Sequence, residues 1–241
     1  MEHIIEAEHV SRRYPLDHNF VMALDDVTLR LERGEFLAIA GPSGTGKSTL
    51  LNPIGCIDSP SSGRIRIEGI DTSALKPAQL AALRRKRIGF VFQTFNLIPV
   101  FTAWENVEFP LLLGRVADRD RKRRVENALE SVGLADRARH RPDLLSGGER
   151  RRIAVARAIV HRPALVLADE PTANLDTHTA VQLIDLMRDL NRSLGLTFVF
   201  ATHDQRLLGR ADRIVRMCDG RVVEDAGIRG VNYAEVSVAG N

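Results

Sequence analysis

A short glycine-rich segment has the residues and the spacing needed to bind phosphate. It reads GPSGTGKST from 41 to 49, with Gly41 and Gly46 separated by four residues and followed by Lys47 and Ser48. Glycine backbones can turn their N–H groups inward around an anion, the lysine ammonium can reach the outer phosphates, and the serine hydroxyl can bind Mg²⁺. The segment therefore predicts a nucleotide site formed by Gly41, Pro42, Ser43, Gly44, Thr45, Gly46, Lys47, Ser48 and Thr49.

Two neighbouring carboxylates supply the groups that hydrolysis of a bound triphosphate requires. Asp169 and Glu170 follow the apolar run 165–168, which places both at the end of a buried strand. Asp169 is positioned to hold Mg²⁺ through its water shell, and Glu170 to act as the general base or water-orienting group. We therefore expect ATP hydrolysis, with Lys47 and Glu170 catalytic and with Ser48 and Asp169 as metal ligands.

Another candidate anion site lies about 100 residues after the first. In the sequence LSGGE, from 145 to 149, Ser146 is placed at the N-cap of a helix and two glycines follow it. The first N–H groups of a helix have no partner inside it and can bind an anion. Since the first loop already holds one side of a γ-phosphate, we expect Ser146, Gly147 and Gly148 to bind the ATP of a second copy. Taken alone, the motif also fits an ordinary helix start.

The elements around these motifs indicate an α/β fold. A short apolar run at 35–40 enters the glycine-rich loop, as a strand buried in a parallel sheet would. The alternating segments 4–10 and 21–31 predict an antiparallel β layer, and the later alternation of strands with helices implies right-handed crossovers. Further strands are predicted at 88–92, 164–168 and 197–201, and around Ile214 and Val222.

The middle of the chain predicts a helical subdomain inserted into this core. Helical signals dominate from about 77 to 148, where apolar residues at 125, 128, 129 and 132 share one helix face. The second helix start lies at the end of this insertion. We therefore expect residues 1–241 to form a single domain, with 226–241 as a loosely attached tail.

Composition limits the class of partner. The net charge is only +3, which gives no argument for nucleic acid. The apolar runs are far shorter than the roughly 20 residues of a membrane-spanning helix, and the first residues lack the pattern of a secretory signal. We therefore expect no nucleic-acid partner, and a role at a membrane only through another chain.

Basic runs and cysteines have ordinary interpretations. The runs at 84–87, 121–124 and 150–152 are typical of solvated helix faces, with contact to acidic lipid or to nucleotide phosphate as the alternative. Cys56 and Cys218 lack the spacing of a metal site, so free thiols are expected.

Together, these motifs and their order resemble the ABC transporter ATPase family over roughly residues 3 to 225. The resemblance implies a P-loop NTPase (RecA-like) mixed sheet core with an antiparallel β layer and an inserted α-helical subdomain. It implies that Tyr14 stacks on adenine, and that Gln93 contacts Mg²⁺ and the attacking water. It also places His203 on the γ-phosphate, Ser146, Gly147 and Gly148 on the opposite subunit's ATP, and Asp176, in the loop 174–176, at the dimer interface.

Several stretches of the sequence are most similar to those of the lipoprotein-releasing and macrolide-export ATPases. The similar stretches are LLN at 50–52, IGCID at 54–58, IGFVFQ at 88–93, FNLIP at 95–99, TAWENV at 102–107, HRP at 140–142 and LADEPT at 167–172. This implies a peripheral ATPase on the cytoplasmic face of the inner membrane. It would dimerise around two ATP and power an integral-membrane permease that exports or extracts a lipoprotein or hydrophobic compound.

Two other functions fit the same motifs. The first is a regulatory ATPase that transmits force to a membrane partner of the cell-envelope or division type, which moves no substrate. The second is a soluble ABC protein of DNA repair or translation, which is less favoured because the chain has neither two cassettes nor a long coiled-coil insertion. The sequence does not identify a cargo, since nothing in this chain need touch it.

Two residues depart from the family pattern. Pro53 falls in the helix after the glycine-rich loop, where it removes one backbone hydrogen bond, so we expect a kink or local irregularity. Glu149 replaces the commoner glutamine and adds negative charge near an ATP site, and we expect Arg150 or Arg151 to offset it.

Overall fold

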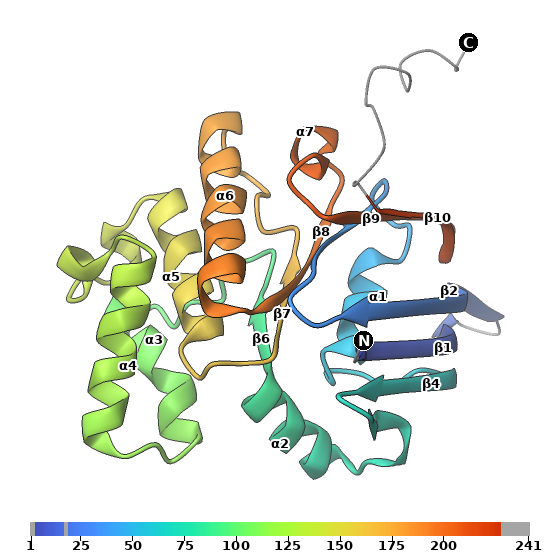
Figure 1. The fold of residues 1–241 in the computed structure, drawn as a ribbon, viewed down its shortest axis with the longest axis horizontal. Coiled ribbons are helices and arrows are strands. Elements are labelled where there is room, and N and C mark those ends of the chain that lie inside the picture. The colour runs from blue at the N-terminus through green and yellow to red at the C-terminus, as the bar shows by residue number, and fades with distance from the viewer. Residues whose placement is uncertain (1–2, 17–18, 228–241) are drawn as a thin grey trace.

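The computed structural model describes residues 3–16 and 19–227, which form two sheets flanked by helices (Figure 1). The smaller sheet is antiparallel, with the order β2-β1-β4-β5. It confirms the predicted antiparallel layer. Its strands are β1 (His3–Leu16), β2 (Asn19–Glu32), β4 (Ser62–Ile67) and β5 (Ile70–Asp71).

The larger sheet is mixed and has the order β10-β9-β3-β8-β7-β6. Strands β6, β7, β8, β3 and β9 run parallel, and β10 is antiparallel to β9. The predicted mixed sheet core is therefore confirmed. Its strands are β3 (Phe36–Ala40), β6 (Ile88–Val91), β7 (Leu165–Asp169), β8 (Thr197–Thr202), β9 (Arg213–Cys218) and β10 (Arg221–Gly227).

Helices cover this sheet and form a lobe at one side of it (Figure 1). That lobe contains α3, α4 and α5, far from the β1–β2 hairpin, and α4 buries Val125, Ala128 and Leu129, as their spacing predicts. None of the helices in the described ranges is both long and apolar enough to cross a membrane. The helices are α1 (Lys47–Ile54), α2 (Pro77–Arg87), α3 (Ala103–Leu113), α4 (Asp118–Ser131), α5 (Gly147–Ile159), α6 (Thr177–Leu194) and α7 (Gln205–Leu208), with short 3₁₀ turns at Thr72–Ala74, Ala135–Arg137 and Pro142–Leu144.

The large sheet separates two apolar cores. Alternate residues of a strand point to opposite faces, so Phe36 and Ala38 pack toward α3–α6 whereas Leu37 and Ile39 pack toward α1 and the small sheet. All five residues of β3 and all six of β8 are buried. The continuous apolar runs therefore fit strands covered on both faces.

The predicted tail, 226–241, begins inside the part of the chain that the structure describes. Ala226 and Gly227, its first two residues, pair with Ile214 and Arg213 in the sheet. The rest of that segment, 228–241, lies outside the described residues.

The β6 strand and α5 touch through their backbones. A Cβ added to Gly89 would lie 2.1 Å from the carbonyl oxygen of Ala158, so only glycine allows this approach. Strand and helix therefore pack with no side chain from Gly89 between them.

Pro53, where the sequence predicts a kink or local irregularity, lies near the end of α1. Pro53 is the seventh of the eight residues of α1, which ends at Ile54. The N–H of Gly55 then donates to the carbonyl of Leu51 at 2.7 Å. The proline thus lies in the last turn of the helix.

We predict that the two thiols differ in reactivity. Cys56 is 2% exposed and its burial raises the pKa of the thiol to about 11, whereas Cys218 is exposed. Since the thiolate is the reactive form, a disulfide reagent at pH 8 should label one thiol rapidly and a second only on unfolding. The Cys218→Ser variant should lose the rapid phase, and a rapid phase that persists in it would contradict this assignment.

Candidate nucleotide site

The glycine-rich loop connects the carboxyl end of β3 to α1. Gly46, which precedes the helix, has φ 97° and ψ 3°, a left-handed backbone that favours glycine. A Cβ on it would lie 2.6 Å from the carbonyl oxygen of Ala23, and one on Gly41 would lie 2.5 Å from that of Met217. Backbone from neighbouring segments therefore packs directly against the loop at both glycines.

Lys47 is buried within this loop. Its side chain is 5% exposed, and Nζ donates to the carbonyl oxygens of Gly41 at 2.7 Å and Pro42 at 2.8 Å. The ammonium also lies 3.5 Å from Oε1 of Glu170. The loop thus holds its cation beside the acidic end of β7.

Ser48 and Asp169 meet across the site. Ser48 Oγ donates to Asp169 Oδ1 at 2.8 Å, although 121 residues separate them. Burial and the charge of Glu170 raise the pKa of Asp169, while the hydrogen bond from Ser48 and the charge of Lys47 lower it, and the net shift is upward. The two oxygens thus form a pair of hard donors at the edge of the phosphate loop.

Glu170 turns away from the strand into the same site. Its backbone has φ 45°, a left-handed conformation that costs a non-glycine residue about 1–3 kcal/mol and is found most often at functional sites. Its Oε2 lies 2.9 Å from Nδ1 of His203, whose side chain is 62% exposed. Lys47, Ser48, Asp169, Glu170 and His203 are therefore brought together at one edge of the sheet.

Two other predicted residues, Tyr14 and Gln93, have contacts outside this cluster. The Tyr14 hydroxyl donates to Asp58 Oδ2 at 3.3 Å, and the guanidinium carbon of Arg12 lies 4.7 Å from the centre of the tyrosine ring. Gln93 follows β6 and is exposed, with its backbone carbonyl bound by Arg151.

The predicted helix start at Ser146 is present. Ser146 is the N-cap of α5, its Oγ accepts from the N–H of Glu149 at 3.2 Å, and Glu149 Oε2 accepts from the N–H of Ser146 at 2.8 Å. The Glu149 carboxylate thus takes part in a reciprocal capping box. The expectation that Arg150 or Arg151 offsets its charge is wrong, because Arg137 Nε lies 3.2 Å from Glu149 Oε1.

Asp176 lies next to this helix start. Its carboxylate caps α6, accepting from the N–H of Thr179 at 3.0 Å and from its hydroxyl at 2.6 Å. A Cβ on Gly148 would lie 2.9 Å from Cγ2 of the same threonine. The starts of α5 and α6 therefore form a second group, separate from the contacts around Lys47.

Comparison with known proteins identifies the family of this chain. A family model described as ABC transporter matches residues 24–173, a stretch that includes the phosphate loop, the α5 start and the acidic strand end. The chain belongs to the ABC transporter family. It is an ATP-binding and ATP-hydrolysing subunit of such a transporter, as predicted, on a P-loop NTPase fold.

Three relatives of this ABC subunit are informative. The chain is 47% identical to the lipoprotein-releasing system ATP-binding protein LolD of Bordetella pertussis, over 92% of this chain and 96% of that one. It is 47% identical to the macrolide export ATP-binding/permease protein MacB of Rhodopirellula baltica over 92% of this chain, but spans only 33% of that protein. The dimeric post-hydrolysis structure of the ATP-binding cassette MJ0796 bound to ADP and Pi has a TM-score of 0.87 and 41% identity, covering 94% of this chain and 100% of that one.

The sequence analysis missed two arginines that bind backbone carbonyls inside this ABC subunit. The interpretation of 150–152 as a solvated face is wrong for Arg151, which is 0% exposed. Arg157 is partly buried, and desolvation lowers the pKa of its guanidinium. A signal existed, because Arg151 shares one helix face with the apolar residues Val155 and Ala158 at i+4 and i+7. Both arginines bind backbone carbonyls of residues 92–96.

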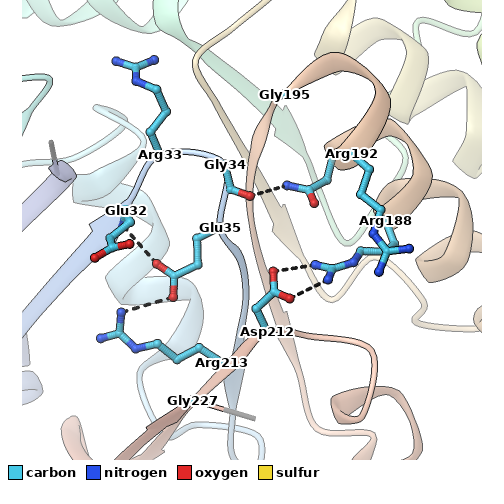
Figure 2. Close-up of a pocket in the computed structure, with 11 residues that line it drawn as sticks. Glu32, Arg33, Gly34, Glu35, Arg188, Arg192, Gly195, Asp212, Arg213 and Gly227 are labelled. Atoms are coloured by element: carbon cyan, nitrogen blue, oxygen red, sulfur yellow. Dashed lines mark hydrogen bonds and ion pairs between the residues drawn. The ribbon is translucent and has the colours of Figure 1, made fainter. Parts of the chain in front are cut away.

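A large hollow of about 700 Å³ lies at the opposite end of the sheet (Figure 2). Arg188 forms a two-pronged ion pair with Asp212, which also accepts from the N–H of Phe36 at 3.2 Å. Arg213 reaches Glu35 at 3.3 Å. These pairs join the C-terminal part of α6 to the starts of β3 and β9, so the hollow is lined by contacts that hold the ABC core together.

We predict that Glu149→Ala lowers the free energy of unfolding of this ABC subunit by about 1 kcal/mol, the usual size of a capping contribution. Hydrogen bonds from Ser146, together with Arg137, lower the pKa of Glu149. A lowered folded pKa means that this stabilisation is present above the unfolded value, about 4.3, and is lost as the pH falls through the folded value. Urea unfolding of parent, Glu149→Ala and Glu149→Gln at pH 7 and in acid measures it. A difference between parent and alanine variant that does not shrink in acid would contradict the ionic capping box.

Proposed function

We propose that two copies of this chain bind two ATP head to tail and that hydrolysis drives a membrane permease. The observation that carries this proposal is that one chain has two separate groups of residues suited to bind phosphate. One contains Lys47, Ser48, Asp169, Glu170 and His203, and the other is the α5 start beside α6. A triphosphate held by the first still has a face free for the second group of another copy.

The residues of the first group divide the chemistry among them. The backbone of Gly41 to Thr49 and the Lys47 ammonium bind the phosphates, and Tyr14 stacks on adenine through the ring face not covered by Arg12. Glu170 orients the attacking water, and the 2.9 Å contact with His203 fixes the direction of its carboxylate. In this proposal Gln93 contributes a contact to the water and to the metal.

The donor set fits Mg²⁺. Ser48 and Asp169 supply two hard oxygens 2.8 Å apart, and the described residues contain no cluster of three or more His, Cys, Asp or Glu that could form an all-protein metal cage. Magnesium commonly keeps waters and phosphate oxygens in its shell and takes only one or two protein ligands. When bound, the ion would neutralise charge on the phosphates, with Ser48, Asp169 and Gln93 holding it.

The second group supplies the contacts across the dimer. Ser146, Gly147 and Gly148 present the N-terminal end of α5, and Asp176 places the start of α6 beside it. Donors at this end interact with the γ-phosphate of the other copy only while that phosphate is attached. ATP therefore joins the subunits and its hydrolysis releases them. The related cassette MJ0796 has been solved as a dimer bound to ADP and Pi.

The partner in this proposal is an integral-membrane permease, with the ATPase on the cytoplasmic face of the membrane. One relative is a lipoprotein-releasing ATP-binding protein and another carries ATP-binding and permease parts in one chain. Both support export or extraction of a lipoprotein or a hydrophobic compound. The alternative is a force-transmitting ATPase whose partner moves no substrate. Purification with the native membrane partner separates the two, because a partner with a substrate cavity supports transport and one bound to a cell-wall hydrolase supports regulation.

The decisive test is nucleotide-dependent dimerisation. Glu170→Gln keeps the size of the side chain but removes the carboxylate that orients water, so we expect it to bind ATP, hydrolyse it at least about 100-fold more slowly and accumulate as a dimer. Size-exclusion chromatography with light scattering, with ATP and Mg²⁺ against ADP and Mg²⁺, measures this. The double variant Ser146→Arg, Glu170→Gln should stay monomeric. A Glu170→Gln protein that remains monomeric at saturating ATP would refute the proposal.

A further inference from the structure

Arg151 is a buried cation in the second turn of α5, just behind the phosphate-facing end of the helix. Its guanidinium donates through Nη1 to the carbonyl oxygens of Phe92 at 2.7 Å and Gln93 at 3.0 Å. Through Nη2 it donates to Gln93 at 3.0 Å and to Ala173 at 3.2 Å. The side chain is fully buried, and the ring of Phe95 lies 4.6 Å from the guanidinium carbon.

These partners do not neutralise the charge. All four hydrogen bonds go to backbone carbonyls, and within residues 3–16 and 19–227 no carboxylate pairs with Arg151. A buried charge without an ion partner is costly. Burial also lowers the pKa of Arg151 to about 10, which still leaves the guanidinium charged at neutral pH.

The three carbonyls belong to two loops with different roles. Phe92 and Gln93 begin the loop after β6, and Ala173 lies in the loop from Glu170 to Asp176. The N–H of Ala173 also donates to the carbonyl of Glu170 at 3.1 Å, so this contact reaches the residue that faces the phosphates. Arg151 therefore binds the backbone of Gln93 and, at the same time, that of Ala173, whose own N–H is bonded to Glu170.

We propose that Arg151 is a positioning residue that locks the start of α5, the Gln93 loop and the Glu170–Asp176 loop into one unit. The inference rests on the proposed roles of Ser146, Gln93 and Glu170. ATP of the other copy, bound at the α5 start, then orders the two loops that serve this copy's own ATP. The planar guanidinium suits this role because its fixed fork of donors spans carbonyls from separate segments, which one terminal nitrogen of lysine spans poorly.

Arg157 provides an internal comparison. It lies six residues after Arg151 on α5 and donates to the carbonyls of Phe95 at 2.9 Å and Asn96 at 2.6 Å. Both acceptors belong to the Gln93 loop, so Arg157 holds one loop where Arg151 holds two. A substitution of Arg151 should therefore disturb both loops, whereas a substitution of Arg157 should disturb only the Gln93 loop.

The first test is steady-state kinetics of Arg151→Gln and Arg151→Lys. We expect kcat to fall about tenfold or more in the glutamine variant and less in the lysine variant, with KM for ATP within about twofold of the parent, because the arginine touches no nucleotide. Arg162→Gln is the matched control, since it removes the same charge from an exposed position just after α5. A folded Arg151→Gln protein with the parent kcat overturns the proposal. So does a kcat loss matched by an equal loss of ATP affinity.

The second test is hydrogen exchange in the Glu170→Gln background, with and without ATP and Mg²⁺. With Arg151 present, ATP should slow exchange at the α5 start and in segments 93–97 and 171–176 together. With Arg151→Gln, only the α5 start should respond, whereas Arg157→Gln should release 93–97 alone. Arg151→Lys is measured in parallel, so that the proposal can still be tested if the glutamine variant fails to fold. Equal protection of all three segments without Arg151 overturns the proposal.

Failure of the inference is distinguishable from failure of the proposed function. If Gln93→Ala and Ser146→Arg leave ATP hydrolysis unchanged, the roles assigned to the two groups are wrong. If those variants lose activity while folded Arg151→Gln retains it, only the role of Arg151 is wrong.

Discussion

The side-by-side packing of β3, β7 and β8 determines where all the reactive groups lie. These strands are parallel and covered on both faces, and their register pairs Ala40 with Thr202 and Asp169 with Ala201. Their carboxyl ends must therefore reach the same edge of the sheet. Lys47, Glu170 and His203, widely separated in sequence, become neighbours through this constraint alone. Moving one strand by a residue would turn its side chains to the wrong face and would separate the cation from the acids.

Features that depend on residues close together in the sequence could be predicted from it. The phosphate loop, the acidic strand end and the N-cap at Ser146 are local patterns, in which residue types and spacing determine the geometry. The partner of Glu149 was not predictable in this way, because Arg137 reaches it from a 3₁₀ turn that precedes α5. Arg151 was misjudged because a run of arginines is ordinarily solvated, and only the helix face it shares with Val155 indicated burial.

The capping box limits what the start of α5 can offer an anion. Glu149 accepts the N–H of Ser146, and the Ser146 hydroxyl oxygen accepts the N–H of Glu149. Neither of these two N–H groups is therefore free for a phosphate unless the box opens. The remaining donors are the hydroxyl proton of Ser146 and the N–H groups of Gly147 and Gly148. The carboxylate that stabilises the helix thus limits the donors that an anion can reach to the Ser146 hydroxyl and the N–H groups of the two glycines.

The contact between Gly89 and Ala158 has a mechanical consequence. Since the backbones of β6 and α5 touch there, the C-terminal half of α5 cannot slide or tilt against the sheet without breaking that contact. A swing of the helical lobe must therefore bend the chain elsewhere, in the segments leading into α3 and out of α4. Helix α5 is thus fastened to the sheet near its C-terminal end, opposite the end that carries Gly147 and Gly148.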